Sequence, residues 1–383
     1  MNVQTIKSKL PQVGTSIFTV MSRMAQEYNA INLSQGFPDF PCDNALIQKT
    51  LKYMQLGHNQ YAPMTGLPVL RTEISKLVAK KYGATYDAEK EITITSGATE
   101  ALFCAIMSLV HEGDEVLIIE PAYDCYVPAV QLAGGTTVAI GLEYPNYTIN
   151  WDAVKRVINR NTRVIILNTP HNPTGMIWSE QDMANLEKLV KDNNIFIISD
   201  EVYEHIVFDN QTHQSVARYP NLRSRSMIIS SFGKTFHVTG WKVGYCLAPE
   251  HLTREFRKVH QFVTFSTATP FQAAIAEYMQ DDTPIQQLSS FYQEKRDYFL
   301  ELMKGTRFKP LHTAGTYFQL MSYAEISDEK DTVFCERLVK EHGVAAIPVS
   351  VFYRKGVDNK VVRFCFAKDF QTLERAADRL RKV

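Results

Sequence analysis

Short runs of apolar, β-branched residues alternate with amphipathic stretches, and this alternation most limits what the chain can fold into. An uninterrupted apolar run is typical of a strand that is buried on both faces of a sheet. Strands that alternate with helices form parallel sheets covered by helices. We therefore predict an α/β domain with a largely parallel sheet. The runs cover residues 91–95, 115–120, 136–143, 163–168, 195–200 and 226–230.

Two of the intervening stretches carry clear helix signals. Residues 98–113 repeat leucine and isoleucine at helical spacing. Residues 179–194 begin with a capping box from Ser179 to Asp182, followed by apolar residues at the same spacing. We expect each stretch to cross back over the sheet between two strands.

The C-terminal part has a different pattern, which predicts a smaller α+β domain. Helical patterns cover residues 285–305, 332–343 and 370–383, and strand patterns cover 316–321 and 361–367. The first 40 residues are expected to be irregular. We predict an N-terminal segment (1–45) that packs with the small domain, a large domain (46–280) and a small domain (281–383).

Charge and cysteine usage exclude several classes of function. Lysine plus arginine and aspartate plus glutamate balance at 41 each. This balance gives no electrostatic reason to expect nucleic acid or a membrane surface as partner, so we expect a small-molecule substrate. The six cysteines are dispersed without a C-x-x-C pair, so we expect no metal site and no disulfide framework. No signal-peptide core or membrane-length apolar run is present, which predicts a cytoplasmic protein.

Polar motifs follow four of the predicted strands directly. They read SGATEA after residue 95, TPHNPTG after 168, EVYEH after 200 and SFGK after 230. Ligands of open α/β sheets bind at the carboxyl ends of the strands. The motifs therefore predict one polar pocket. Lys234 stands out in it, because lysine is among the residues least often buried.

The order of these motifs resembles the class I (fold-type I) aminotransferases, which depend on pyridoxal 5′-phosphate. The resemblance extends over nearly the whole chain. INLSQGFPDF, NQYAPMTG, ILNTPHNPTG, SDEVYEHIVF, SSFGKTFHVTGWKVGY and GVAAIPVSVFY look closest to the methionine aminotransferases of bacteria and to kynurenine–glutamine aminotransferases. The resemblance implies a homodimer with shared active sites that acts on amino acids and 2-oxo acids.

The resemblance also implies roles for the residues that would surround the cofactor ring. Lys234 would form a Schiff base with the aldehyde and act as the catalytic base, which requires a neutral amine. Asp200 would pair with the ring nitrogen and keep it protonated. Asn172 and Tyr203 would hydrogen-bond the 3-oxygen, and Tyr123 would stack on the ring.

A second set of residues would hold the cofactor phosphate. The backbone amides of Ala98 and Thr99, at a helix start, suit an anion. Ser231 and Lys242 would complete the cup. Tyr61 matches the tyrosine with which members of the family reach the phosphate of the neighbouring subunit.

The remaining motif positions would bind the substrate. Arg363 would clamp the α-carboxylate with its planar guanidinium, near Gly36 and Asn172. Phe18 and Phe265 would line the side-chain pocket, Phe265 from across the dimer interface. An aromatic pocket without a second arginine favours methionine, followed by aromatic amino acids, kynurenine or glutamine, and disfavours aspartate.

One alternative remains open within the same fold. A C–S β-lyase that cleaves cysteine conjugates would use the same lysine, and the sequence separates it poorly from an aminotransferase. A transcriptional regulator of this fold needs a DNA-binding extension, for which the 30 residues before INLSQG leave no room. A nicotinamide dehydrogenase is not favoured, because no G-x-G-x-x-G follows the first strand.

Overall fold

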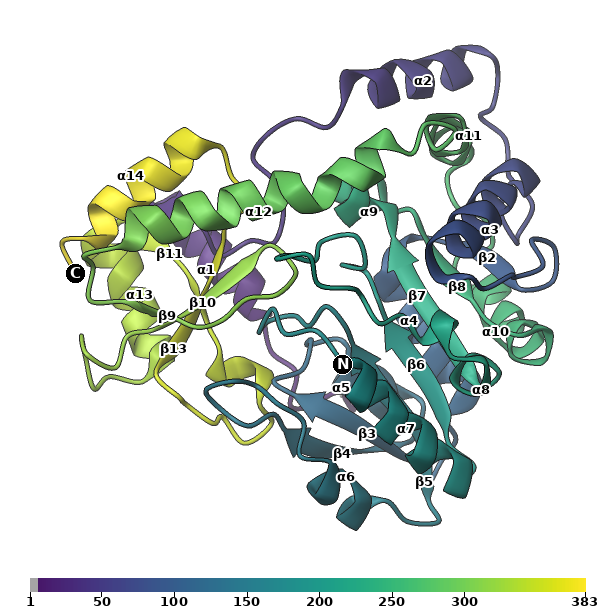
Figure 1. The fold of residues 1–383 in the computed structure, drawn as a ribbon, viewed down its shortest axis with the longest axis horizontal. Coiled ribbons are helices and arrows are strands. Elements are labelled where there is room, and N and C mark those ends of the chain that lie inside the picture. The colour runs from purple at the N-terminus through teal and green to yellow at the C-terminus, as the bar shows by residue number, and fades with distance from the viewer. Residues whose placement is uncertain (1–5) are drawn as a thin grey trace, which may run out of the picture.

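The larger part of the chain is built on a seven-stranded sheet (Figure 1). The computed structural model describes residues 6–383. Neighbouring strands are parallel from β4 to β7, whereas β8 runs antiparallel to both of its neighbours. The prediction of an α/β fold with a mostly parallel sheet is therefore confirmed. In spatial order the strands are β2 (Ile92–Thr95), β8 (Gly244–Leu247), β7 (Ser226–Ser231), β6 (Phe196–Asp200), β5 (Thr162–Asn168), β3 (Glu115–Glu120) and β4 (Thr136–Gly141).

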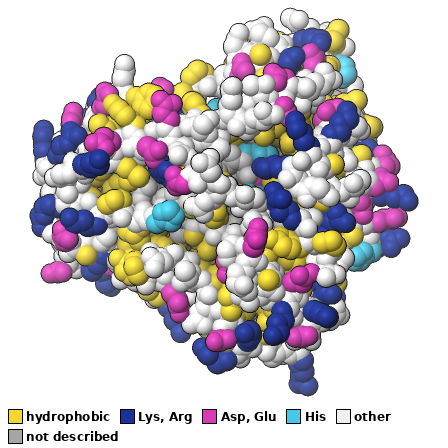
Figure 2. Space-filling model, in the orientation of Figure 1, with side chains coloured by type: hydrophobic (Ala, Val, Ile, Leu, Met, Phe, Trp, Pro, Cys, Tyr) yellow, Lys and Arg dark blue, Asp and Glu magenta, His cyan; other side chains and the backbone are white. Residues whose placement is uncertain are grey.

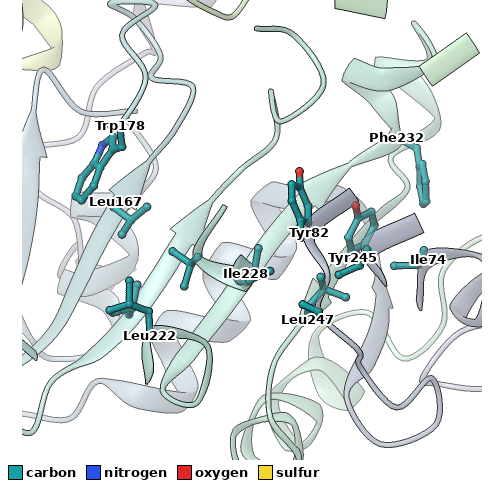
Figure 3. Close-up of a cluster of buried hydrophobic side chains, with 14 of the residues drawn as sticks. Ile74, Tyr82, Leu167, Trp178, Leu222, Ile228, Phe232, Tyr245 and Leu247 are labelled. Carbon is teal, nitrogen blue, oxygen red and sulfur yellow. The ribbon is translucent and has the colours of Figure 1, made fainter. Parts of the chain in front are cut away.

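Both faces of this sheet are buried, and alternate apolar residues of a central strand belong to different cores. In β5, Ile165 and Leu167 belong to the core on one face, and Val164 and Ile166 to the core on the other. Figure 3 shows side chains of the first core, among them Leu167. Burial on both faces explains why these strands appear in the sequence as continuous apolar runs.

Helices cover the two faces. The helices α4 (Gly97–Leu109), α5 (Tyr126–Leu132) and α10 (Glu250–Val263) contribute to one core, and α3 (Pro68–Tyr82), α7 (Glu180–Asp192) and α11 (Thr269–Tyr278) to the other. The predicted capping box at the start of α7 is present. The other helices of the larger part are α2 (Asn44–Gln55), α6 (Trp151–Val157), α8 (Pro220–Arg223) and α9 (Phe232–Thr235).

The C-terminal part forms a core of its own around an antiparallel sheet of order β12-β13-β10-β9. The helix α12 runs along the top of the view from the larger part to the smaller one (Figure 1). The elements are α12 (Thr283–Met303), β9 (Lys309–Pro310), β10 (Phe318–Ser322), α13 (Asp331–His342), β11 (Val344–Ala345), β12 (Ile347–Pro348), β13 (Val361–Cys365) and α14 (Phe370–Leu380).

The N-terminal segment is not irregular as expected, since it contains α1 (Ile17–Glu27) and β1 (Ile31–Asn32). Ser16 caps α1 by accepting from the Thr19 amide. Met21 and Met24 place its apolar face in the core of the smaller part, and β1 pairs with β11. The domain boundaries at residues 45 and 280 remain a prediction.

The six strands predicted for the larger sheet occur within two residues of their expected bounds. The sequence analysis missed β8, which has only four residues. In the described residues, no helix combines the length and the apolar character needed to cross a membrane.

Candidate active site

A cavity of about 300 Å³ lies at the carboxyl ends of β5, β6 and β7. Twelve of the fourteen predicted site residues line this cavity together. They come from the N-terminal segment, the start of α4, the strand ends and β13. These residues are Phe18, Gly36, Ala98, Thr99, Tyr123, Asn172, Asp200, Tyr203, Ser231, Lys234, Lys242 and Arg363.

The other two predicted residues, Tyr61 and Phe265, lie outside this cavity. Their rings pack edge to face with centroids 5.3 Å apart, and their exposed fractions are 82% and 50%. Leu56 and Phe262 are also exposed large apolar residues. The predicted roles of Tyr61 and Phe265 concern a neighbouring subunit and therefore stay predictions.

Lys234 is held at the centre of the cavity by two oxygen atoms. It lies in α9, which begins directly after β7. Its Nζ donates to the Tyr317 hydroxyl (2.8 Å) and to the carbonyl of Gly36 (3.1 Å). Burial lowers the pKa of this amine to about 8, and the nearby cations Lys242 and Arg363 act in the same direction. The amine is thus within reach of its neutral, nucleophilic form at physiological pH.

Asp200 is a buried carboxylate whose orientation is fixed. It ends β6, and its Oδ2 accepts a 2.6 Å hydrogen bond from the Tyr126 hydroxyl. Burial raises the pKa of Asp200 to about 6, although the bond from Tyr126 opposes this shift. A cation placed against this carboxylate would be stabilised strongly, because little water competes for it.

The start of α4 forms a site suited to an anion. Its N-cap residue, Ser96, makes no side-chain cap hydrogen bond. The first-turn amides, which include those of Ala98 and Thr99, have no partner within the helix. Gly97 has a φ of +75°, and a Cβ there would lie 3.1 Å from Lys242 Nζ. Only glycine lets the lysine come this close to the helix start.

Arg363 is almost fully buried in β13, with 1% of its surface exposed. Its Nη1 donates to Asn172 Oδ1 (2.8 Å) and its Nη2 to the carbonyl of Ser34 (3.0 Å). The guanidinium carbon lies 3.8 Å from the centroid of the Phe318 ring. Its buried Nε has no hydrogen-bond partner within residues 6–383. A buried guanidinium with an unused donor is a ready site for a carboxylate.

Three residues of the site were missed by the sequence analysis or given another role. Tyr317, on the smaller part, holds Lys234 and also donates to the carbonyl of Gly36 (2.5 Å). Tyr126, to which the sequence analysis assigned no role, donates to Asp200 and orients it. Asn168 ends β5 and accepts from the amide of Asn172 (2.7 Å). Only its position at a strand end could have pointed to Asn168.

One buried cluster near the site could be mistaken for a metal centre. Ligand atoms of Glu100, Cys104 and His260 lie within 4.8 Å of one another. Hydrogen bonds account for them, since the Cys104 thiol and His260 Nδ1 both lie 2.8 Å from Glu100 Oε1. Burial also raises the pKa of the thiol, which disfavours the thiolate that a metal requires.

Residues 28–380 match the family described as aminotransferase class I and II. The chain belongs to this family. It is 47% identical to methionine aminotransferase of Escherichia coli over 98% of both chains. A solved E. coli structure with a methionine aminotransferase function covers the full length of both chains at 47% identity, with a TM-score of 0.97.

Two further relatives act on other amino donors. Human kynurenine–oxoglutarate transaminase 1 is 33% identical over 94% of both chains. The structure of N-succinyldiaminopimelate aminotransferase from Mycobacterium tuberculosis has a TM-score of 0.95 at 35% identity, covering 99% of this chain and 100% of that one. The chain is therefore a transaminase, and the resemblance drawn from its motifs is confirmed.

The family depends on pyridoxal 5′-phosphate, and the residues of this cavity fit that cofactor. An amine of lowered pKa (Lys234) suits its aldehyde, and a buried carboxylate (Asp200) suits a protonated ring nitrogen. The free amides of α4 and the Lys242 ammonium suit its phosphate. The aromatic ring of Tyr123 also lines the cavity.

Uptake of pyridoxal phosphate by the cofactor-free protein should depend on pH through Lys234. Only the neutral amine attacks an aldehyde. Since the pKa is about 8, we expect the uptake rate to rise about tenfold per pH unit below 8 and to level off above it. Stopped-flow absorbance in amine-free buffers measures the rate, and Lys234→Ala gives the background. An inflection near the ordinary lysine value of 10.5 would contradict this prediction.

Proposed function

We propose that this transaminase moves the amino group of methionine to a 2-oxo acid, with aromatic amino acids, kynurenine or glutamine as further donors. The observation that carries the proposal is the joint position of the Lys234 amine and the buried Arg363 guanidinium in one cavity with aromatic walls. The 47% identity to methionine aminotransferase supports the choice of donor.

The walls of the cavity favour an uncharged donor side chain. Phe18 and Phe318 line it, and both rings lie beside the Arg363 guanidinium. The lining cations are Lys234, Lys242 and Arg363, each with a proposed partner in the cofactor or the α-carboxylate. A second substrate carboxylate would then be buried unpaired, at a cost of several kcal/mol. A thioether gains from contact with aromatic rings.

The residues would divide the chemistry as follows. Pyridoxal phosphate supplies an aldehyde that takes up amino groups and a ring that stabilises negative charge at the substrate α-carbon. Lys234 would be its attachment point, and the Nζ, once neutral, would accept the α-proton and later return a proton. Tyr317 and the Gly36 carbonyl orient this atom. Arg363 would hold the α-carboxylate and so fix the direction of the Cα–H bond.

The donor preference is tested with a panel of amino acids and one fixed oxo acid. We expect methionine to have the highest kcat/KM, followed by phenylalanine, tyrosine, kynurenine or glutamine. Aspartate should rank at least about a hundredfold lower, because its second carboxylate has no partner in the cavity. A panel in which aspartate exceeds methionine would disprove the pocket argument and leave the cofactor chemistry untouched.

We further propose that the active unit is a homodimer in which Tyr61 completes the phosphate site of the partner. The contact between the exposed rings of Tyr61 and Phe265 supports this proposal, because exposed large apolar side chains in contact are typical of an interface. Sedimentation and dilution assays of the holoenzyme measure the assembly. We expect Tyr61→Phe to weaken cofactor retention by about 1–2 kcal/mol, the value of one charge-assisted hydrogen bond. A fully active monomer would contradict this proposal.

The alternative, a C–S β-lyase, gains no support from the relatives. Those named above are transaminases. Production of pyruvate from a cysteine conjugate without any oxo acid would be the sign of lyase activity, since a lyase needs no amino acceptor.

A further inference from the structure

A second cavity, of about 410 Å³, shares no lining residue with the active site. It is bounded by the end of α3, the segment of residues 204–213 and the start of α12. In Figure 2, lysine, arginine and histidine side chains gather on the face turned to the reader, between the positions of α12 and α3. The residues that line this second cavity have no role in the transamination proposed above.

Arg218 lines this cavity without a counter-ion. No carboxylate within residues 6–383 forms a salt bridge with it. Its Nε and Nη2 donate to the carbonyls of His213 and Lys81, both at 3.2 Å, and its guanidinium lies 5.2 Å from the centroid of the Tyr82 ring. Its Nη1 has no hydrogen-bond partner in the described part of the chain. This half-buried cation therefore retains a free donor.

Lys81 also lines this cavity, and its Nζ lies 5.3 Å from the centroid of the same Tyr82 ring. Its Nζ lies 2.8 Å from the carbonyl of Glu204 and 2.6 Å from His205 Nδ1, and it contacts no carboxylate directly. Burial lowers the pKa of Lys81 to about 8, against the attraction of Glu204. An anion beside this amine would stabilise its charged form and raise the pKa again.

The carboxylate of Glu204 cannot neutralise both cations. It accepts hydrogen bonds from the hydroxyls of Tyr82, Ser230 and Tyr245. Both tyrosines belong to the first core of the larger sheet. Figure 3 shows Tyr82 and Tyr245 beside each other there. Burial alone would raise the pKa of Glu204, but His205, Lys81 and these hydrogen bonds lower it to about 2. Glu204 thus acts on Lys81 through space without a direct ion pair, and Glu201 acts in the same direction.

The other charged pair in the cavity is balanced. Lys80 forms a salt bridge with Asp282 at the rim. His213 is buried, with Nε2 at 2.8 Å from Glu201 and with Nδ1 unpartnered among the described residues. The lining thus has three cations (Lys80, Lys81 and Arg218) against two carboxylates (Glu204 and Asp282) and an unused polar atom. The Glu201 carboxylate behind His213 offsets part of this positive charge. Leu77, Val207 and Ile285 give it an apolar wall.

We propose that this cavity binds a small organic anion, with a carboxylate head between Arg218 and Lys81 and a short apolar body against Leu77, Val207 and Ile285. A planar carboxylate can accept from the free Nη1 of Arg218 and from the Lys81 ammonium at the same time. Both donors are partly shielded from water, which strengthens the contact. An inorganic anion would fit this cavity less well, because it would leave the apolar wall uncovered.

Calorimetric titration of the holoenzyme with 4-methylpentanoate tests this proposal. The probe has the required head and body, and it has no amino or keto group to be turned over. Because the probe could also bind Arg363, we compare wild type with Arg363→Gln. We expect one equivalent to bind in Arg363→Gln, and Arg218→Gln to weaken that equivalent by about tenfold or more.

Arg223, on the short helix α8, provides a matched control. Arg223 also lies over a tyrosine ring, that of Tyr86, at 5.8 Å, and it does not line the cavity. Arg223→Gln should leave binding unchanged. A second variant, Thr212→Trp, fills the cavity from an exposed position and should abolish the equivalent even if Arg218→Gln fails to fold. Failure of Arg363→Gln to bind the probe, or binding that survives Thr212→Trp, would overturn the proposal.

Discussion

Replacement of Lys234 by alanine is expected to lower kcat with methionine by on the order of 10⁴-fold. The change removes the amine that we assign as attachment point and as carrier of the α-proton, and proton transfer by a positioned base contributes up to about 10⁴ by itself. The fold should tolerate the change, because Lys234 makes only two hydrogen bonds and lies in a four-residue helix.

The measurement combines single-turnover kinetics with borohydride reduction. In the wild type, borohydride should fix the cofactor covalently to the peptide that contains Lys234. The variant should still bind pyridoxal phosphate through the groups around Asp200 and α4, but reduction should fix none of it at this site. Lys188→Ala, which removes an exposed lysine on α7, serves as the control. Transamination at a normal rate in Lys234→Ala would disprove the assignment of Lys234 as attachment point and proton carrier.

Replacement of Arg363 by glutamine is expected to lower kcat/KM for methionine by roughly 150-fold, equivalent to about 3 kcal/mol. The buried guanidinium would lose its charge-assisted hydrogen bonds to the α-carboxylate, and its Nε is the donor that the described protein leaves free. Arg363→Lys should recover only part of this loss, because an ammonium cannot form the planar fork.

A second substrate separates this role from a general loss of structure. We expect wild type to prefer methionine strongly over 3-(methylthio)propylamine, which has the same side chain and no carboxylate. In Arg363→Gln this preference should largely disappear, whereas a variant that is merely destabilised would lose activity on both amines equally. An unchanged preference would show that another group binds the carboxylate.

The parallel sheet was predictable because its signal is local. Each strand is a continuous apolar run, and a central strand covered on both faces allows no other composition. The antiparallel β8 (Gly244–Leu247) was missed because its four residues, GYCL, include no β-branched residue, whereas the equally short β2 (ITIT) consists of them. The helix α1 was also missed, although Ser16 and the spaced methionines give it an ordinary helix signal.

The site was predictable to the extent that its residues belong to ordered motifs. Asp200 ends a strand, and Lys234 and Asn172 lie shortly after one, so the sheet itself brings them to one edge. Tyr317 could not be found in this way. It lies 83 residues from Lys234 in the sequence, inside a stretch that reads only as a strand, and its hydroxyl reaches the amine only after the two parts of the chain pack together.

The sequence alone determined the α/β architecture, the family and the set of groups that meet at the strand ends, because strand periodicity and motif order are properties of the chain. The tertiary structure decided which charges are exposed to water and which are not. Burial by distant segments lowers the pKa of Lys234 and raises that of Asp200. Packing of distant segments also leaves Arg218 in a second cavity without a counter-ion. The electrostatic environment of a side chain depends on the groups that surround it in the folded protein, and a local sequence pattern does not reveal these groups.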